Sequence, residues 1–272
     1  MNWLWFSLVI IVCYLIGNVN FARVIARVFK HEDITTKGSG NPGMMNMLRN
    51  YGIGYALLTL LLESIKAGVP ALVCGYIFAS QGLFEVAFFT AGFSVVLGHN
   101  FPVFYKFKGG KGIACTFGMF LFSPFWWLSI VMFFVWAVFL YFVDYAFLAS
   151  LGFVSSLTIA WIVKLCIIQP TLWWVALIIL CVNFALDLFL HRSNFRRWFK
   201  GTENHTNFSS KVKKLFSHKE KAEQPENEAP EKEIIIEDDS SEQTTGENKQ
   251  PESEVQPESE SENTEKTNKE NN

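Results

Sequence analysis

Long apolar runs alternate with short polar segments over the first 190 residues of the chain. A helix needs about 20 mostly apolar residues to cross the hydrocarbon core of a bilayer. The pattern therefore predicts an all-α, polytopic integral membrane protein with about seven transmembrane helices, of which the fourth is short and its full crossing is left open. The predicted spans are residues 3–28, 52–79, 83–97, 113–122, 125–143, 146–163 and 171–190.

Charge divides the chain into two unlike parts. Residues 1–216 hold 17 Lys and Arg against 7 Asp and Glu, and residues 217–272 hold 6 against 18, so the net charge of −2 describes neither part. The acidic part has too few apolar residues to offset its ordering entropy. We predict a transmembrane domain over residues 1–205, a basic juxtamembrane segment over residues 206–217, and a disordered acidic tail over residues 218–272.

Basic residues also predict the orientation of the chain. They gather after the first, third and seventh runs, in residues 23–49, 106–111 and 192–200. Cytoplasmic loops of membrane proteins carry an excess of Lys and Arg. We therefore expect these three segments to face the cytoplasm, with the N-terminus outside and the C-terminus inside. The first run lacks the basic start and cleavage site of a secretory signal and is interpreted as a retained span.

Several reactive residue types have no pattern that indicates a function. The five cysteines lie one per apolar run, without the spacing of a metal site or a disulfide framework. Glu85 and Asp187 lie near predicted span ends and are interpreted as structural. Glu63 and Lys66, three residues apart inside the second run, are either a mutually satisfied helix pair or functional intramembrane charges. The sequence leaves these two alternatives open.

Three polar, glycine-rich segments lie at the predicted cytoplasmic ends of spans, in residues 37–49, 98–112 and 191–204. Glycines allow consecutive backbone N–H groups to turn toward an anion, and Lys, Arg or a helix start adds positive charge. The segments therefore favour phosphate binding. None has the spacing of a nucleotide-binding P-loop, so an NTPase is not indicated, and no nucleic-acid partner is predicted.

The three segments together resemble the acyl-phosphate:glycerol-3-phosphate acyltransferases, the PlsY family. GHNFPVFYKFKGGKGIA, from Gly98 to Ala114, is close to the family pattern GHxxPxFxxFxGGKGxA, and HRSNFRRWFKGTEN, from His191 to Asn204, is similar to the ending HxxNxxRLxxGxE. The first segment matches GSGNxGATNxxR at Gly38, Ser39, Gly40, Asn41, Gly43, Asn46 and Arg49. Order and spacing hold over roughly residues 1–205, and the acidic tail is not covered.

The resemblance implies a multi-pass enzyme of the bacterial plasma membrane. It would transfer a fatty acyl group from acyl phosphate to the sn-1 hydroxyl of glycerol 3-phosphate, which gives lysophosphatidate and phosphate as the first acylation of phospholipid synthesis. Its partners would be these two substrates and the lipid bilayer, and no cofactor or metal is implied. An acyl phosphate has a good leaving group, so positioning and charge stabilisation can supply most of the rate without a covalent intermediate.

Candidate roles follow for the residues that match. The resemblance and the phosphate chemistry assign Ser39, Arg49, Lys111 and His191 to catalysis, with Lys111 stabilising the developing oxyanion. His191 is a candidate base by residue type, and a substrate phosphate oxygen is the alternative proton acceptor. His99 alone is better interpreted as a hydrogen-bonded structural histidine, although its motif adds it to the substrate-binding set. The remaining members of that set are Gly38, Gly40, Asn41, Asn46, Gly109, Gly110, Gly112, Asn194, Arg197 and Glu203.

The sequence departs from the family pattern at four places. Met44 and Met45 replace a small residue and a threonine, and Phe147 replaces a serine near the start of the sixth run. Glu63 replaces an aspartate, and Ala67 replaces a glycine. These departures leave open a catalytically degenerate membrane scaffold, and anion sites on a helical bundle would also suit a transporter of a phosphorylated small molecule.

Overall fold

The computed structural model describes residues 3–210, and every regular element within this range is helical. Six helical segments are long and apolar enough to cross a membrane, so the prediction of an all-α membrane protein is confirmed. The acidic tail and most of the predicted juxtamembrane segment lie outside the described residues. The helices are α1 (Trp3–Gly17), α2 (Phe21–Lys30), α3 (Met44–Tyr51), α4 (Ile53–Ile77), α5 (Phe84–Asn100), α6 (Ile113–Leu121), α7 (Trp126–Val143), α8 (Ala146–Ile168), α9 (Trp173–Leu190) and α10 (Arg192–Phe199).

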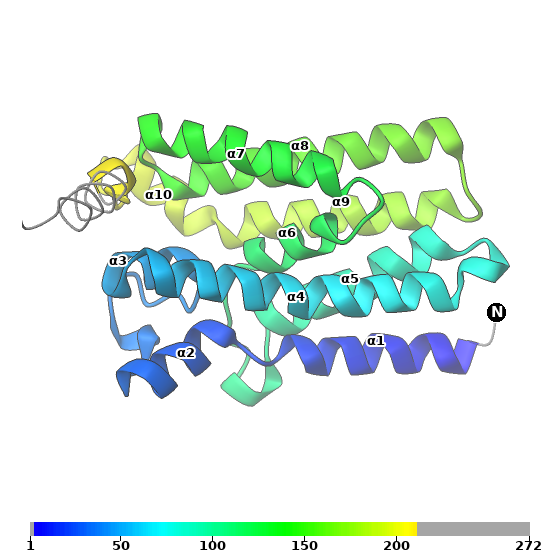
Figure 1. Cartoon of the computed structure of the whole chain (residues 1–272), viewed down its shortest axis with the longest axis horizontal. Helices are drawn as coiled ribbons and strands as arrows, with labels where there is room; N and C mark the ends of the chain where they lie inside the picture. The colour runs from blue at the N-terminus through cyan, green and yellow to red at the C-terminus, as the bar shows by residue number, and fades with distance from the viewer. Residues whose placement is uncertain (1–2, 211–272) are drawn as a thin grey trace, which may run out of the picture. The chain divides into compact units, whose positions relative to one another are not determined.

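The fourth predicted span is the one that does not have the length of a crossing. It forms α6, which has nine residues and therefore extends only ~14 Å along its axis, about half the hydrocarbon thickness. In Figure 1 the turn between α6 and α7 lies short of the far ends of α4, α5, α8 and α9. The domain thus has six candidate spans and one short helix inserted among them.

The first predicted span is broken near its middle. α1 ends at Gly17 and α2 begins at Phe21, with Asn20 capping α2 by accepting a hydrogen bond of 2.9 Å from the Arg23 backbone N–H. A Cβ atom on Gly17 would lie 2.2 Å from the Val95 carbonyl oxygen, so α1 and α5 pack backbone against backbone. Small residues allow this close approach between membrane helices.

A buried cluster of Glu63, Lys66 and His99 satisfies the backbone groups that this break exposes. The Lys66 ammonium lies 2.6 Å from the Val19 carbonyl oxygen, and Glu63 Oε1 accepts a 2.7 Å hydrogen bond from the Phe21 N–H. The Glu63 and Lys66 side chains are 2.5 Å apart, and His99 Nδ1 is 3.0 Å from Glu63 Oε2. Of the two alternatives for Glu63 and Lys66, the geometry favours the mutually satisfied pair.

The buried cluster also includes atoms of the kind that bind metals. Glu63, His99 and Cys115 bring one ligand atom each to within 4.8 Å of one another. The Lys66 ammonium, however, bonds to Glu63 Oε2, the oxygen that His99 Nδ1 also contacts, and lies 3.2 Å from His99 Nδ1. The positive charge at this position is therefore supplied by the lysine.

Helices α5, α6 and α8 meet in an aromatic core. Phe88 and Phe89 of α5 and Phe120 of α6 are fully buried with Trp161 of α8. The Phe89 and Trp161 rings meet edge to face with centroids 4.9 Å apart. Figure 1 shows α2, α3 and α10 gathered at one end of the bundle, opposite the N-terminus of α1. The first and third polar segments thus reach one end of the bundle.

Candidate functional site

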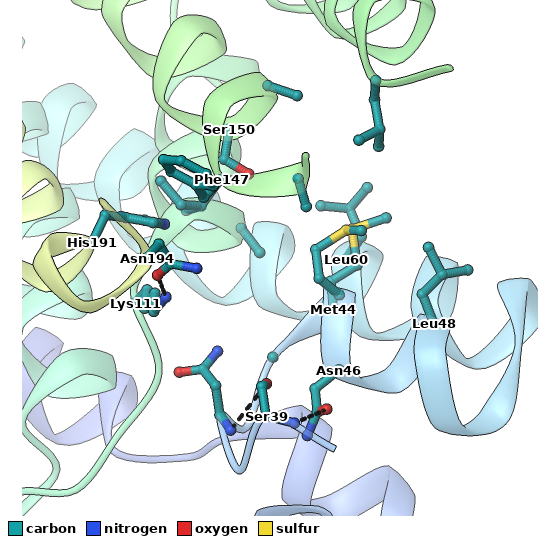
Figure 2. Close-up of a pocket in the computed structure, with 18 of the residues that line it drawn as sticks. Ser39, Met44, Asn46, Leu48, Leu60, Lys111, Phe147, Ser150, His191 and Asn194 are labelled. Carbon is teal, nitrogen blue, oxygen red and sulfur yellow. Dashed lines mark hydrogen bonds between the residues drawn. The ribbon is translucent and has the colours of Figure 1, made fainter. Parts of the chain in front are cut away.

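A cavity of about 580 Å³ opens where the three polar segments meet. Apolar side chains from α4, α6, α7 and α8 extend it into the bundle. Figure 2 shows Leu60 of α4 and Phe147 of α8 among them. Gly38 and Gly110 do not border the cavity. The other predicted site residues do: Ser39, Gly40, Asn41, Asn46, Arg49, His99, Gly109, Lys111, Gly112, His191, Asn194, Arg197 and Glu203.

The glycine loop, residues 37–43, is shaped by Asn46 at the start of α3. Asn46 Oδ1 accepts the Ser39 N–H at 3.1 Å, and its amide donates to the carbonyls of Ile34 and Lys37 at 3.1 and 3.0 Å. Gly38 has a φ of +54°, and a Cβ there would lie 2.4 Å from Asn46 Oδ1. Both amide hydrogens of Asn46 are thus bonded to backbone carbonyls, whereas the motif predicts that this residue binds the substrate. Asn46 therefore shapes the loop and also borders the cavity, whereas Gly38 does not border it.

The lysine loop, residues 108–112, rests on His99. The Gly110 N–H donates to the His99 carbonyl at 3.1 Å, and a Cβ on Gly110 would lie 2.1 Å from His99 Nε2. Gly112, with a φ of +82°, turns the chain into α6. Since the other ring nitrogen of His99 bonds to Glu63, this histidine connects the buried cluster to the loop. Its buried, hydrogen-bonded ring fits the structural interpretation, although it also borders the cavity.

Lys111 begins a chain of polar contacts that joins the second and third segments. Its ammonium donates to Asn194 Oδ1, as the dashed line in Figure 2 marks. Asn194 Nδ2 donates to Glu203 Oε1, and Arg197 Nε donates to Glu203 Oε2, both at 2.7 Å. Burial and the nearby positive charges of Arg197 and Arg49, opposed in part by Glu203, lower the pKa of Lys111 to about 8.

Arg49 adds a further cation from α3. One of its terminal nitrogens donates to the Asn204 carbonyl at 3.4 Å. Its Nε is buried and has no hydrogen-bond partner among the described residues. Burial lowers the pKa of this guanidinium as well, although arginine remains charged at any physiological pH. A buried donor without a protein partner is suited to an anionic ligand.

His191 lies at the junction of α9 and α10 and is 3% exposed. Its Nδ1 is 2.8 Å from the Asp187 carbonyl oxygen. A carbonyl can only accept, so Nδ1 carries the hydrogen and Nε2 of the neutral ring keeps its lone pair. Burial and the Lys111 charge, partly opposed by the bond to Asp187, lower the pKa of His191 to about 4. The ring is therefore neutral near pH 7 and able to accept a proton.

The apolar part of the cavity reaches the outer surface of the bundle. Phe117, Phe133 and Phe153 line its interior. Leu57 of α4 and Phe134 of α7 also line it and are 47% and 63% exposed on the side of the spans. The cavity thus opens sideways between α4 and α7, toward the lipid that surrounds a membrane protein.

Three of the four departures from the family pattern border the cavity: Met44 with Met45, Glu63, and Phe147. Met45 packs against the apolar cluster of Leu140, Ala146 and Ala149. Phe147 is buried, with its ring centroid 5.2 Å from that of Phe195 on α10. Sequence reasoning gives Phe208 and Asn204 no site role, yet both border the cavity. No sequence signal identified Phe208, because it follows the last motif.

Comparisons with known proteins agree on one family. The family model described as "Glycerol-3-phosphate acyltransferase" matches residues 7–201. The glycerol-3-phosphate acyltransferase of Shouchella clausii is 37% identical over 70% of this chain and 91% of its own length. That of Finegoldia magna is 36% identical over 75% of this chain and 98% of its own length.

Two solved structures are also similar. The crystal structure of PlsY, an integral membrane glycerol 3-phosphate acyltransferase, in its glycerol 3-phosphate form has a TM-score of 0.62 and 31% identity. The match covers 74% of this chain and 94% of that one. The lysophosphatidic acid form of PlsY gives a TM-score of 0.59 with 30% identity and the same coverage.

Proposed function

The chain belongs to the glycerol-3-phosphate acyltransferase family, and from this we propose that it takes the acyl group from acyl phosphate. It is an integral membrane glycerol-3-phosphate acyltransferase. In the proposed reaction the sn-1 hydroxyl oxygen of glycerol 3-phosphate forms a bond to the acyl carbonyl carbon, and the bond from that carbon to the phosphate oxygen breaks. The products are lysophosphatidate and inorganic phosphate.

The observation that carries the proposed donor is the charge at the polar end of the cavity. Arg49, Lys111 and Arg197 converge there against the carboxylate of Glu203. The carboxylate of Glu63 also borders the cavity, but it is paired with Lys66. Two phosphate groups, one from each substrate, would balance this excess of positive charge. A donor with phosphate attached directly to the acyl group places its anion and its chain on adjacent parts of one cavity, which is how the cationic and apolar walls are arranged.

The proposed roles follow from the positions of the side chains. Lys111 and the backbone of its loop hold the phosphate of the donor and stabilise the charge that develops on the acyl oxygen. Arg49 and Arg197 bind the phosphate of glycerol 3-phosphate, beside the Ser39 hydroxyl. His191 Nε2 accepts the proton of the attacking hydroxyl, with a substrate phosphate oxygen as the competing acceptor.

The orientation in the membrane is also a proposal. Basic side chains gather at the cavity end of the bundle, whereas the opposite end holds Lys164 close to Glu85. By the positive-inside rule the cavity end faces the cytoplasm and the N-terminus lies outside, in a bacterial plasma membrane. Reporter fusions at the two termini test this: a C-terminal reporter that is active only outside the cytoplasm should remain inactive.

The test of the donor uses purified protein in detergent. Radiolabelled glycerol 3-phosphate is offered with palmitoyl phosphate and, in parallel, with palmitoyl-CoA, and labelled lysophosphatidate is followed. We expect product from palmitoyl phosphate alone. Product from palmitoyl-CoA alone would contradict the proposed donor. Folded protein that gives no product from either donor would favour the transporter or scaffold alternatives.

A further inference from the structure

The segment Gly201–Phe208 follows α10 and reaches both parts of the cavity; we call it the strap. Near its start Glu203 is 8% exposed and binds Asn194 and Arg197, as described above. The backbone carbonyl of the next residue, Asn204, accepts a hydrogen bond from the Arg49 guanidinium. The first half of the strap therefore touches three residues of the polar end.

The other end of the strap forms a wall of the apolar part. Phe208 borders the cavity and packs against the apolar cluster of Leu140 of α7 with Ala146 and Ala149 of α8. Glu203 and Phe208 are five residues apart in the sequence, yet they face the anionic and the acyl portions of the proposed ligands. One short segment thus contributes to the binding of both.

The strap is held by Asp144, which ends α7 in a left-handed conformation with a φ of +59°. The Thr206 hydroxyl donates to Asp144 Oδ1, and the Phe208 N–H donates to the same oxygen at 3.2 Å. The Thr206 N–H donates to the Asp144 carbonyl at 3.1 Å. His205 Nδ1 lies 3.3 Å from Asp144 Oδ2. Three residues of the strap, His205, Thr206 and Phe208, are therefore fixed to Asp144.

Asp144 and Thr206 do not themselves border the cavity, although Asn204 before Thr206 and Phe208 after it do. Thr206 is fully buried, so its hydroxyl needs the Asp144 carboxylate as a partner. Release of this anchor would free Glu203, Asn204 and Phe208 together. A change at one buried hydroxyl would then alter the binding of two chemically different ligands.

We propose that Asp144 and Thr206 are positioning residues that set the strap so that glycerol 3-phosphate and the acyl donor are bound together, and that Phe208 contacts the acyl chain. This inference rests on the proposed function. The side chains proposed to bind phosphate contact Glu203 and Asn204, so their positions depend on the bonds between Asp144 and the strap. The position of Phe208, beside the acyl chain, depends on the same bonds. Loss of the Asp144–Thr206 contact therefore weakens the binding of both substrates, whereas loss of the Phe208 ring weakens the binding of the acyl donor only.

The test measures KM for each substrate and kcat in four variants of the full chain. Thr206→Val removes the hydroxyl at nearly constant volume, and we expect both KM values to rise roughly three- to tenfold, because a hydrogen bond to a charged group is lost. Thr206→Ser keeps the hydroxyl and should retain wild-type values. Phe208→Ala should raise the KM of the acyl donor by about tenfold and leave that of glycerol 3-phosphate unchanged. Phe199→Ala removes a phenyl ring that is 78% exposed on α10 and should change neither.

The pattern of KM values separates positioning from folding. A variant that merely folds less well has fewer active molecules, which lowers apparent kcat and leaves both KM values unchanged. That result for Thr206→Val, or a Thr206→Ser variant that behaves like Thr206→Val, overturns the proposal. If the wild-type enzyme uses palmitoyl-CoA instead, the donor assignment fails, and the same comparison with that donor still decides the role of the strap.

Discussion

Two groups of charged side chains lie inside this membrane domain, and they differ in how their charges are balanced. In the buried cluster, Glu63 and Lys66 neutralise each other, and their remaining hydrogen-bonding capacity is used by His99 and by the backbone at the break between α1 and α2. Glu63 and His99 also border the cavity, but the charges of the cluster are balanced within it. Its charges maintain an interrupted helix in a medium that otherwise penalises free N–H and C=O groups.

The polar end of the cavity has the opposite balance. Three cations meet one carboxylate, and Arg49 keeps a buried donor without a protein partner. The difference shows that an ionisable residue in a membrane span is by itself ambiguous. Charge that is matched within the protein indicates architecture, and charge that is unmatched indicates the place of a ligand.

The largest expected effect concerns the stability of the buried cluster and is produced by a substitution of Glu63. Glu63→Gln leaves the buried Lys66 ammonium without its counter-charge, and we expect the free energy of unfolding to fall by about 3–5 kcal/mol. Denaturant or thermal unfolding in detergent measures it. Addition of Lys66→Met should restore part of the loss, and Glu85→Gln at the opposite end should change stability by less than about 1 kcal/mol. Equal losses for Glu63→Gln and Glu85→Gln would contradict the structural role of the cluster.

The next effect is on catalysis, at Lys111. Lys111→Ala should lower kcat by about 10²–10³-fold, because a preorganised donor to the developing oxyanion is lost. The unfolding midpoint should change little. Lys164→Ala, which removes a lysine that packs on the Trp161 ring far from the cavity, is the matched control and should keep normal turnover. Intact turnover in Lys111→Ala would remove the phosphate and oxyanion assignment.

The contrast between the two groups was only partly predictable from the sequence. The motifs identified the residues of the polar end because each carries glycines beside a cation or an amide. The break after Gly17 was missed, since two asparagines within a long apolar run are not enough to outweigh its hydropathy. Once the break is known, the pairing of Glu63 and Lys66 has a reason, because free backbone groups are then available to bind them.

Other differences depend on contacts between distant residues. Asn46 matches a motif position that suggests a ligand, and only the folded loop shows that its amide is used by the carbonyls of Ile34 and Lys37. The contact between Asp144 and Thr206 joins residues 62 positions apart with no periodic signal. α6 was identified as short because the run from which it forms is short, which composition alone reveals.

A smaller effect concerns the proton acceptor. His191→Gln should lower kcat by about 10²-fold if Nε2 is the base. The KM for each substrate should change less than kcat, since the phosphate ligands remain. A near-normal rate in His191→Gln would transfer the base role to a phosphate oxygen of the substrate and leave the other assignments intact.

The smallest effect is the pH dependence that these two residues produce. His191, with a pKa of about 4, is neutral and able to accept a proton above that pH, and Lys111, with a pKa of about 8, is charged below that pH. Above pH 8 kcat/KM should therefore fall by about tenfold per pH unit. In Lys111→Arg this alkaline decline should disappear, because arginine stays charged. A decline that persists unchanged in Lys111→Arg would assign it to another group.

The sideways opening between Leu57 and Phe134 has a consequence for how the rate of this enzyme is expressed. Glycerol 3-phosphate binds from aqueous solution, so its amount is expressed as a molar concentration. An acyl donor that enters between α4 and α7 arrives from a surface, where what matters is its mole fraction among the surrounding lipids. Additional lipid or detergent at constant total donor then slows the reaction with no inhibitor present, because the same molecules are spread over a larger area.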